Sequence, residues 1–268
     1  MSTVAGPGEA AIRARAAALP DPWTAPGDEP VAVGEDLSVL TLLAAYRVGL
    51  FPWPAGGLTW WWSPDPRAVL DPMALRLPRT VRRRLARRDL TTTVDQAFDA
   101  VVAACAERPG EGTWITPAMR SAYGRLHALG RAHSVEVWDG RGRLVGGLYG
   151  VATGGVLTGE SMFHRADDAG TAALVDTVRR LRAGGLVLLD VQQDTPHLRW
   201  LGARPWPRER FLATLAAHAD DAVTLAREPV TIAASLAALR EEDGQAIDGQ
   251  GGGRVHPGMD AQGRRDDR

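Results

Sequence analysis

Cysteine is nearly absent from this sequence of 268 residues, since Cys105 is the only one. One thiol cannot form an internal disulfide bond, and it cannot supply the several thiolates of a structural zinc site. No stretch approaches the roughly 20 consecutive apolar residues that a membrane-spanning helix needs, and residues 1–20 lack the apolar core of a signal peptide. These absences predict a cytoplasmic protein with no membrane partner, and the histidines show no metal-ligand spacing either.

Lysine is absent altogether, so all 31 basic side chains are arginines, which nearly balance 32 acidic ones to a formal net charge of -1. No overall field therefore attracts the chain to polyanions, although such an average can hide a local basic face. Residues 76–88, RLPRTVRRRLARR, contain seven arginines and no acid. Such a run is either a solvated helix face or a contact surface for a phosphate backbone, and the lack of acids favours the second.

The composition, 45% hydrophobic and 24% charged, is typical of a globular protein with one large domain or two modest ones. Residues 1–34 are rich in Ala, Gly and Pro, which predicts a flexible lead-in. Residues 35–66 are expected to form a small N-terminal domain and residues 67–225 the main one. Residues 226–268 become poor in apolar side chains toward their end, which predicts a largely disordered tail.

Residues 146–193 indicate the fold class. Two apolar runs flank a Gly-Gly pair, which predicts two strands joined by a tight turn. Residues 171–182 carry apolar side chains at helical spacing, and residues 186–189 form the short apolar run of a buried strand. Together with an Asp-Gly hairpin signal upstream, this order predicts an α+β fold with mostly antiparallel neighbours.

Polar residues end the last of these strands, at Asp190 and Gln192. Because side chains alternate across a strand, both should point to one side, with Val191 opposite. A carboxylate and an amide at the tip of a buried strand are costly unless they find partners or do chemistry. The pair is therefore either the cap of a loop or helix, or part of a functional site.

Four tryptophans gather between two proline-rich turns within residues 51–70. The prolines forbid a helix there, so the aromatic side chains lie on loops or short strands. Such side chains either form the core of a small domain or offer a stacking platform to a base or an apolar ligand. The four are Trp53, Trp60, Trp61 and Trp62.

Eight motifs follow one another along the chain: AYRVGLFPWP at 45–54, WWSPDPRAVL at 61–70, TWITPAM at 113–119, AYGRLHALGRAHSVEVW at 122–138, LVGGLYGVATG at 144–154, GESMF at 159–163, LLDVQ at 188–192 and HLRWLGA at 197–203. In this order and spacing they closely resemble the leucyl/phenylalanyl-tRNA–protein transferase family, over roughly residues 36–215. The resemblance implies a small N-terminal domain followed by a catalytic, acetyltransferase-like (GNAT-like) domain with a splayed sheet. It implies no cofactor and no metal, and we expect a monomer.

The implied enzyme takes Leu or Phe from aminoacyl-tRNA and joins it to the α-amino group of proteins that begin with Arg or Lys. Such an addition marks the protein for N-degron degradation. An apolar pocket discriminates weakly between apolar side chains, because one methylene group changes the binding free energy by only about 1–3 kcal/mol. Met is therefore kept as a candidate third donor. An aminoacyl ester is already activated, so bringing a neutral amine within reach and stabilising the oxyanion supply most of the rate.

By resemblance, Asp190 and Gln192 form the catalytic pair. We expect Asp190 to orient Gln192 and to favour positive charge on the attacking amine, while the amide oxygen of Gln192 holds that amine. Glu160 is expected to bind the Arg or Lys side chain of the acceptor through a charge-assisted hydrogen bond, with a structural salt bridge as the alternative.

The remaining expected contacts are aromatic, aliphatic and basic, and packing in the core is the alternative for the tyrosines and leucines. The donor end is assigned to Trp53, Trp114, Tyr46 and Tyr123. The pocket for the Leu or Phe side chain is assigned to Leu148, Leu157 and Leu189. The backbone of the tRNA acceptor stem is assigned to Arg79, Arg82, Arg83, Arg84, Arg87 and Arg88, because phosphate contacts carry no sequence information.

Departures from the family pattern bear on pocket size and donor preference. They stand at Leu157, His164, Gly170, Thr171 and Trp200. Two alternative functions stay open at this stage. One is another acyl- or aminoacyltransferase of the same fold, although residues 144–171 hold no Gly-rich turn leading into a helix that would cradle the phosphates of coenzyme A. The other is a tRNA-binding module without catalysis.

Overall fold

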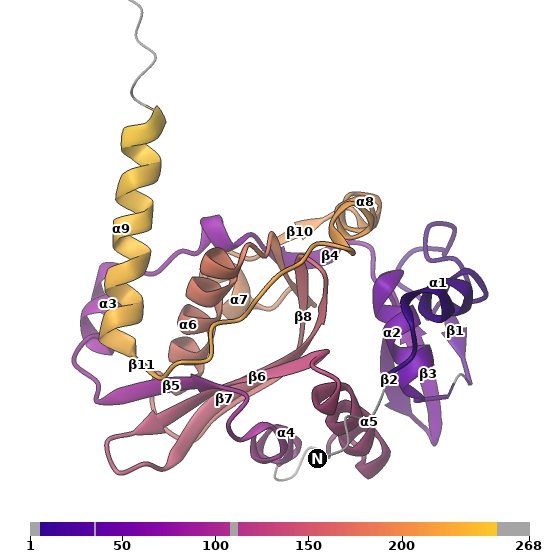
Figure 1. Ribbon diagram of the computed structural model, residues 1–268, viewed down its shortest axis with the longest axis horizontal. Coiled ribbons are helices and arrows are strands. Elements are labelled where there is room, and N and C mark those ends of the chain that lie inside the picture. Colours follow the sequence, from indigo (N-terminus) through magenta and orange to yellow (C-terminus); the bar gives the residue numbers. More distant parts are fainter. Residues whose placement is uncertain (1–5, 35, 108–111, 251–268) are drawn as a thin grey trace, which may run out of the picture.

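The computed structural model describes residues 6–34, 36–107 and 112–250. Two sheets organise it (Figure 1): a three-stranded sheet of order β1-β3-β2 and an eight-stranded sheet of order β10-β4-β9-β8-β7-β6-β5-β11. The first sheet belongs to the small N-terminal part, with α1 (Glu9–Ala17), β1 (Ala32–Val33), α2 (Val39–Arg47), β2 (Phe51–Ala55) and β3 (Leu58–Trp62).

The larger part contains the second sheet and the helices that cover it. In chain order its elements are β4 (Arg67–Leu70), the 3-10 helix η1 (Pro72–Ala74), α3 (Arg79–Leu85), β5 (Leu90–Val94), α4 (Phe98–Ala106), α5 (Pro117–Ala128), β6 (Ala132–Asp139), β7 (Leu144–Thr153), β8 (Val156–His164), α6 (Ala169–Gly184), β9 (Leu188–Gln192), α7 (Pro196–Trp200), β10 (Arg204–Trp206), α8 (Arg208–His218), β11 (Val230–Thr231) and α9 (Ile232–Gln250). The α+β fold predicted from the sequence is confirmed.

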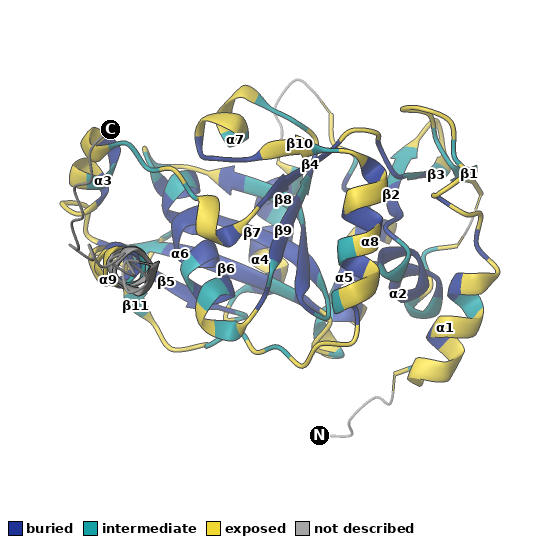
Figure 2. Cartoon of the chain, turned by 90° about the horizontal axis from the view of Figure 1, so that it is seen from above, coloured by how far each residue is buried: buried dark blue, intermediate teal, exposed yellow. Residues whose placement is uncertain are grey.

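Alternation along β7 sends its side chains to two separate cores. Tyr149 and Val151 join the core shared by α4, α5 and the small N-terminal part, whereas Leu148 joins the core under α6. Figure 1 shows α6 on one face of the sheet and α4 and α5 on the other. Figure 2 shows the buried residues concentrated on the central strands and on α6, so both faces of the sheet are covered.

One strand pair in the large sheet is parallel, and it is also where the sheet opens. β8 and β9 pair from Val156↔Leu188 to Thr158↔Asp190, while β8 itself continues to His164. Every other neighbouring pair in the sheet is antiparallel. Beyond Thr158 the two strands are no longer paired, which confirms the prediction of a splayed, mostly antiparallel sheet.

The predicted flexible lead-in at 1–34 is wrong for much of its described part. α1 buries Ile12 and Ala16 in the core next to α2, and Ala32 and Val33 of β1 pair with β3. The richness in alanine misled the prediction, because alanine is the strongest helix former and two or three buried side chains suffice to dock one short helix. Residues 1–5 lie outside the described residues.

The predicted disordered tail at 226–268 is also wrong as far as it is described. β11 adds an eighth strand beside β5, and α9 buries Ile232, Leu236 and Leu239 against the core under α6. A hydrogen bond of 2.7 Å from Ser235 to buried Asp176 fixes α9 further. Residues 251–268 lie outside the described residues. Across residues 6–34, 36–107 and 112–250, no helix has the length and apolar character needed to cross a bilayer.

Candidate functional site

A pocket of about 400 Å³ opens where β8 and β9 separate. Leu148 and Leu189 line it, as predicted, and apolar side chains that the sequence analysis missed complete its walls. Leu157 does not line it, because this residue still pairs with Leu189 in the closed part of the sheet and is 2% exposed. The additional apolar lining residues are Met162, Leu174, Val191 and Leu198.

Two tryptophans from distant segments meet at this pocket. Trp53 on β2 and Trp114 before α5 stack with ring centroids 5.2 Å apart and an interplanar angle of 21°. Both line the pocket. The stack joins the small N-terminal part to the large one, and it presents an aromatic wall that could hold a base or an apolar side chain.

Glu160 lies at an irregularity of β8 that turns its side chain inward. Tyr149 of β7 pairs with Ser161 and Gly150 pairs with Gly159, so Glu160 is the extra residue of a β-bulge. Bulges re-aim side chains in this way. Its carboxylate accepts hydrogen bonds from the hydroxyls of Tyr46, at 2.7 Å, and Tyr123, at 2.6 Å.

Both tyrosines belong to this buried network and do not line the pocket. Tyr46 is 3% and Tyr123 0% exposed, and their hydroxyl oxygens are 2.9 Å apart. The structure thus shows the alternative left open by the sequence, packing with a satisfied hydroxyl, because both hydroxyls end at Glu160. Burial raises the pKa of each phenol well above its ordinary value, so both remain protonated.

The Glu160 carboxyl titrates near neutrality. Burial raises its pKa from 4.5 to about 7, against the hydrogen bonds from Tyr123 and Tyr46 that lower it. When Glu160 is ionised, both hydroxyls donate to it and no proton remains for the contact between the two phenols. When Glu160 is protonated, the three groups can close a ring in which each donates once. The protonated form therefore satisfies every contact of the network.

This raised pKa predicts a pH-dependent stability. Between about 4.5 and about 7 the folded state binds a proton that the unfolded state has lost, so the free energy of unfolding should fall as pH rises through that window, by about 3 kcal/mol in all. Glu160→Gln should remove this fall. Urea unfolding of both proteins at about pH 5 and about pH 7.5 checks it, and parallel pH dependences of the two proteins would refute the assignment.

Asp190 is sealed beneath the pocket by an arginine that the sequence analysis missed. Arg67 donates from Nε (2.8 Å) and Nη2 (2.6 Å) to the two carboxylate oxygens, and the side chains are 1% and 0% exposed. Its guanidinium carbon lies 4.7 Å from the ring centroid of Phe51 and 4.6 Å from that of Phe211. The sequence offered one signal for this arginine: a charged residue begins the otherwise apolar run RAVL at 67–70.

Gln192 lines the pocket, but a strand irregularity that alternation did not predict orients its side chain. β4 pairs Ala68 with Gln192 and Val69 with Asp190, so Val191 is an extra residue. As a result Val191 and Gln192 both line the pocket, whereas Asp190 points to Arg67. The expectation that Asp190 and Gln192 share one side, with Val191 opposite, is wrong because the bulge breaks the alternation.

The backbone at Gln192 is strained, and Asp190 holds it. Gln192 has a φ of 61°, and Gln193 N donates to Val191 O at 2.6 Å, which is the rare γ-turn of positive φ. Asp190 Oδ1 accepts from Gln192 N at 2.9 Å, and the side-chain Nε2 of Gln192 donates to Glu160 Oε1 at 3.3 Å. Asp190 therefore acts on the pocket through the backbone of Gln192.

Two further polar atoms face this site. Tyr149 Oη and Ser161 Oγ are buried, belong to pocket-lining residues and make no hydrogen bond with any described group. Buried hydroxyls are rarely left without a partner, so they are candidates for contact with a bound molecule. In residues 6–34, 36–107 and 112–250, no three His, Cys, Asp or Glu side chains are grouped to hold a metal ion.

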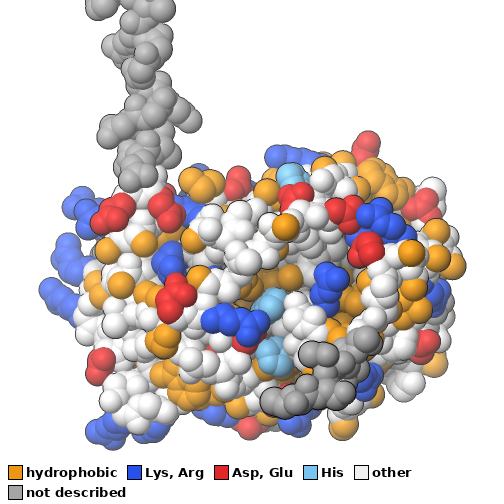
Figure 3. Space-filling model, in the orientation of Figure 1, with side chains coloured by type: hydrophobic (Ala, Val, Ile, Leu, Met, Phe, Trp, Pro, Cys, Tyr) orange, Lys and Arg blue, Asp and Glu red, His pale blue; other side chains and the backbone are white. Residues whose placement is uncertain are grey.

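The arginine run forms α3 and its C-terminal turn, away from the pocket. Figure 3 shows basic side chains along the edge of the molecule where α3 lies. Arg84 binds Asp168 through two hydrogen bonds, and Arg88 lies 3.4 Å from the same carboxylate, so acids from the loop before α6 neutralise part of the run. The members of the run at 76–88 with no ion pair to a described residue are Arg76, Arg79, Arg82, Arg83 and Arg87.

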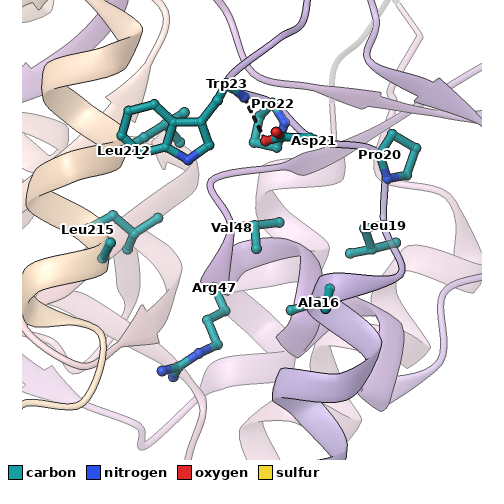
Figure 4. Close-up of a pocket in the computed structure, with 12 residues that line it drawn as sticks. Ala16, Leu19, Pro20, Asp21, Pro22, Trp23, Arg47, Val48, Leu212 and Leu215 are labelled. Carbon is teal, nitrogen blue, oxygen red and sulfur yellow. Dashed lines mark hydrogen bonds between the residues drawn. The ribbon is translucent and has the colours of Figure 1, made fainter.

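Another cavity, of about 350 Å³, lies between α1, the end of α2 and α8 (Figure 4). Trp23, Arg47 and Leu212 are among its lining residues. It shares no lining residue with the pocket at the splayed strands. None of the residues singled out for chemistry lies there, so we assign it no part in the site.

Fold and site together define an acyl-group transferase of the acetyltransferase-like type: a splayed sheet, an apolar pocket at the opening, and a carboxyl and an amide on its wall. Comparison with known families narrows this class. The family model for leucyl/phenylalanyl-tRNA protein transferase matches residues 69–216, and the model of its N-terminal domain matches residues 35–65. The chain belongs to the leucyl/phenylalanyl-tRNA–protein transferase family.

Curated relatives agree with this membership. The leucyl/phenylalanyl-tRNA–protein transferase of Anaeromyxobacter dehalogenans strain 2CP-C is 52% identical over 206 residues, which cover 75% of this chain and 88% of that one. The Shewanella denitrificans enzyme of the same name is 50% identical over 187 residues, covering 69% and 80%. A solved structure of L-PGS from Bacillus licheniformis has a TM-score of 0.36 and 13% identity, covering 55% of this chain and 48% of that one.

Proposed function

We propose that this chain transfers Leu or Phe from aminoacyl-tRNA to the α-amino group of proteins that begin with Arg or Lys, which marks them for N-degron degradation. The observation that carries the proposal is one pocket that combines apolar walls, a stacked tryptophan pair, and the side chains of Gln192 and Glu160. Its volume of about 400 Å³ is in the range of pockets that bury most of a small ligand.

The donor end fits the apolar side of this pocket. Leu148, Leu174 and Leu189 offer aliphatic surface to a Leu or Phe side chain, and the Trp53–Trp114 stack offers a face for the terminal adenosine. Flexible Met162 in the wall would let the pocket adapt to branched and aromatic side chains. Met as a third donor follows from the same weak discrimination.

The acceptor amine belongs beside Gln192. Nε2 of this side chain already donates to Glu160, which leaves the amide oxygen to accept a hydrogen bond from the amine and hold it against the ester carbonyl. The C–N bond forms as the ester C–O bond breaks, and the proton from the amine ends on the released ribose hydroxyl. Asp190 is a positioning residue here, because Arg67 neutralises it and it reaches Gln192 only through the backbone.

Glu160 is proposed to attract the cationic side chain of the acceptor. It lines the pocket, and above its pKa of about 7 it carries a charge that no described arginine pairs with directly. A charge-assisted hydrogen bond to the acceptor would then form across the pocket. The buried hydroxyls of Tyr149 and Ser161 are further candidates for polar contacts with either substrate.

A peptide-transfer assay tests the proposed function. Leu-, Phe- and Met-charged tRNAs are offered separately with a peptide that begins with Arg, and the product is detected as the extended peptide. The same peptide with acetyl-CoA tests the rival acetyltransferase. Binding of tRNA with no transfer from any donor would instead favour the non-catalytic module. The predicted monomeric state and cytoplasmic location stay predictions.

The arginines of α3 should supply salt-dependent tRNA binding. Replacing Arg79, Arg83 and Arg87 together by Ala is expected to weaken binding and to reduce the slope of log Kd against log salt by about 2 to 3, because each lost phosphate contact releases roughly one counterion fewer. The measurement is a salt titration of tRNA affinity.

A matched triple variant on α5 and the turn after it provides the control. It removes the same charge from exposed positions on the other face of the sheet, at Arg120, Arg125 and Arg131. We expect this variant to keep the slope of the parent protein. An equal fall of the slope in both variants would show that only total charge matters.

A further inference from the structure

Trp200 is a large aromatic side chain to which the proposed function assigns no role. It is 47% exposed at the end of α7. A single exposed aromatic side chain is common on a protein surface, but this one lies in a hollow beside the catalytic pocket. α7 itself separates the catalytic pocket from the surface on which Trp200 lies.

The two faces of α7 line two different hollows. Thr195 and Leu198 face the catalytic pocket. Pro196, Arg199 and Trp200, at positions i, i+3 and i+4, share the other face and line a shallow, open surface hollow of about 630 Å³. Arg204 and Pro205 of the edge strand β10 complete that hollow, together with Asp194.

The outer hollow and the catalytic pocket lie on opposite sides of α7. His197 lines the catalytic pocket, and its ring stacks on Trp200 with centroids 6.3 Å apart and an interplanar angle of 29°. In the other direction, Leu201 O accepts a hydrogen bond of 2.9 Å from Arg76 N, shortly before α3. Figure 2 shows α7 lying between β2 and α3.

The charge of this surface suits a polyanion. Arg199 is held by Asp194, which offsets its charge. Arg204 donates hydrogen bonds to the backbone carbonyls of Arg199 and Ala203 and lies exposed in the same hollow as Trp200. It forms no direct ion pair with a described carboxylate, although the charge of Asp194 acts on it at longer range. An aromatic face next to an exposed arginine is the chemistry that binds single-stranded nucleic acid, by base stacking and by phosphate contact.

We propose that Trp200 stacks a base in the single-stranded 3′ end of the donor tRNA, at the nucleotide before the terminal adenosine, and that Arg204 contacts the adjoining phosphate. This assignment rests on the proposed function, which places the terminal adenosine and its amino acid in the catalytic pocket. It adds a second stacking point outside that pocket, between the Trp53–Trp114 pair and the arginines of α3.

The test compares donors of increasing length with one Arg-peptide acceptor: the leucyl ester of adenosine, the leucyl ester of the trinucleotide CCA, and Leu-tRNA. Trp200→Ala should lower kcat/KM for the trinucleotide and tRNA donors by about 5- to 150-fold, the usual loss for one stacked base, and leave the adenosine ester unchanged. Trp200→Phe should recover most of the loss, because it keeps an aromatic face.

Trp23→Ala is the matched control, since Trp23 is 50% exposed and lies at the separate cavity between α1 and α8 (Figure 4). It should leave all three donors unchanged. An equal loss for every donor in Trp200→Ala, no loss at all, or a rise only in the KM of the acceptor peptide would each overturn the proposal. If the parent protein transfers from none of the three donors, the proposed function itself fails, which is a different outcome.

Discussion

Replacing Gln192 by Ala is expected to lower kcat by about 100- to 1000-fold while tRNA affinity stays nearly unchanged. The physical reason is that the amide is held by Glu160 on one side and reaches the pocket on the other, so in the proposed reaction it would contact the amine and not the body of the tRNA. Single-turnover transfer rates, measured alongside the Kd for Leu-tRNA, check this separation of turnover from binding.

Two variants keep this result interpretable, because Gln192 sits at a φ of 61° where any change can disturb the backbone. Gln192→Asn keeps an amide on a residue type that tolerates positive φ, but shortens its reach, so it should lose nearly as much turnover. Gln193→Ala changes the exposed neighbour, which also lines the pocket but makes no side-chain hydrogen bond to Glu160, so it should lose little. A parallel fall of kcat and tRNA affinity in Gln192→Ala would place Gln192 in tRNA binding instead.

Arg67→Ala should lower the free energy of unfolding by about 3–5 kcal/mol, because it leaves Asp190 charged, buried and without its partner. The loss also removes the guanidinium that packs between Phe51 and Phe211. Urea unfolding at neutral pH measures it. Turnover should fall as well, since Asp190 holds the backbone of Gln192.

Removing both charges separates stability from positioning. In the double variant Arg67→Met with Asp190→Leu, an apolar pair of similar bulk replaces the buried ions, and such exchanges are often neutral or stabilising. We expect it to recover most of the lost stability but not the turnover, because Gln192 N loses its acceptor. Recovery of full turnover would show that Asp190 has no positioning role.

The sequence predicted which segments form the site better than it predicted the contacts between their side chains. LLDVQ at 188–192 and GESMF at 159–163, which the sequence singled out, meet at one pocket. Strand alternation then failed at Asp190 and Gln192, because a β-bulge is a single inserted residue that no periodicity reveals. Arg67 was missed for a related reason: its partner lies 123 residues further along the chain.

Local patterning in the sequence determined the family, the α+β class, the Gly-Gly turn between β7 and β8, and the helix that follows them, since each depends on neighbours within a few residues. Only the tertiary structure decided which side chains form hydrogen bonds or ion pairs with each other. Glu160 titrates near neutrality because packing buries it, and this burial outweighs the hydrogen bond from Tyr46, 114 residues away in the chain, which lowers its pKa. Burial and partnership across such distances are properties of packing, and packing also turned two segments that seemed disordered by composition into α1 and α9.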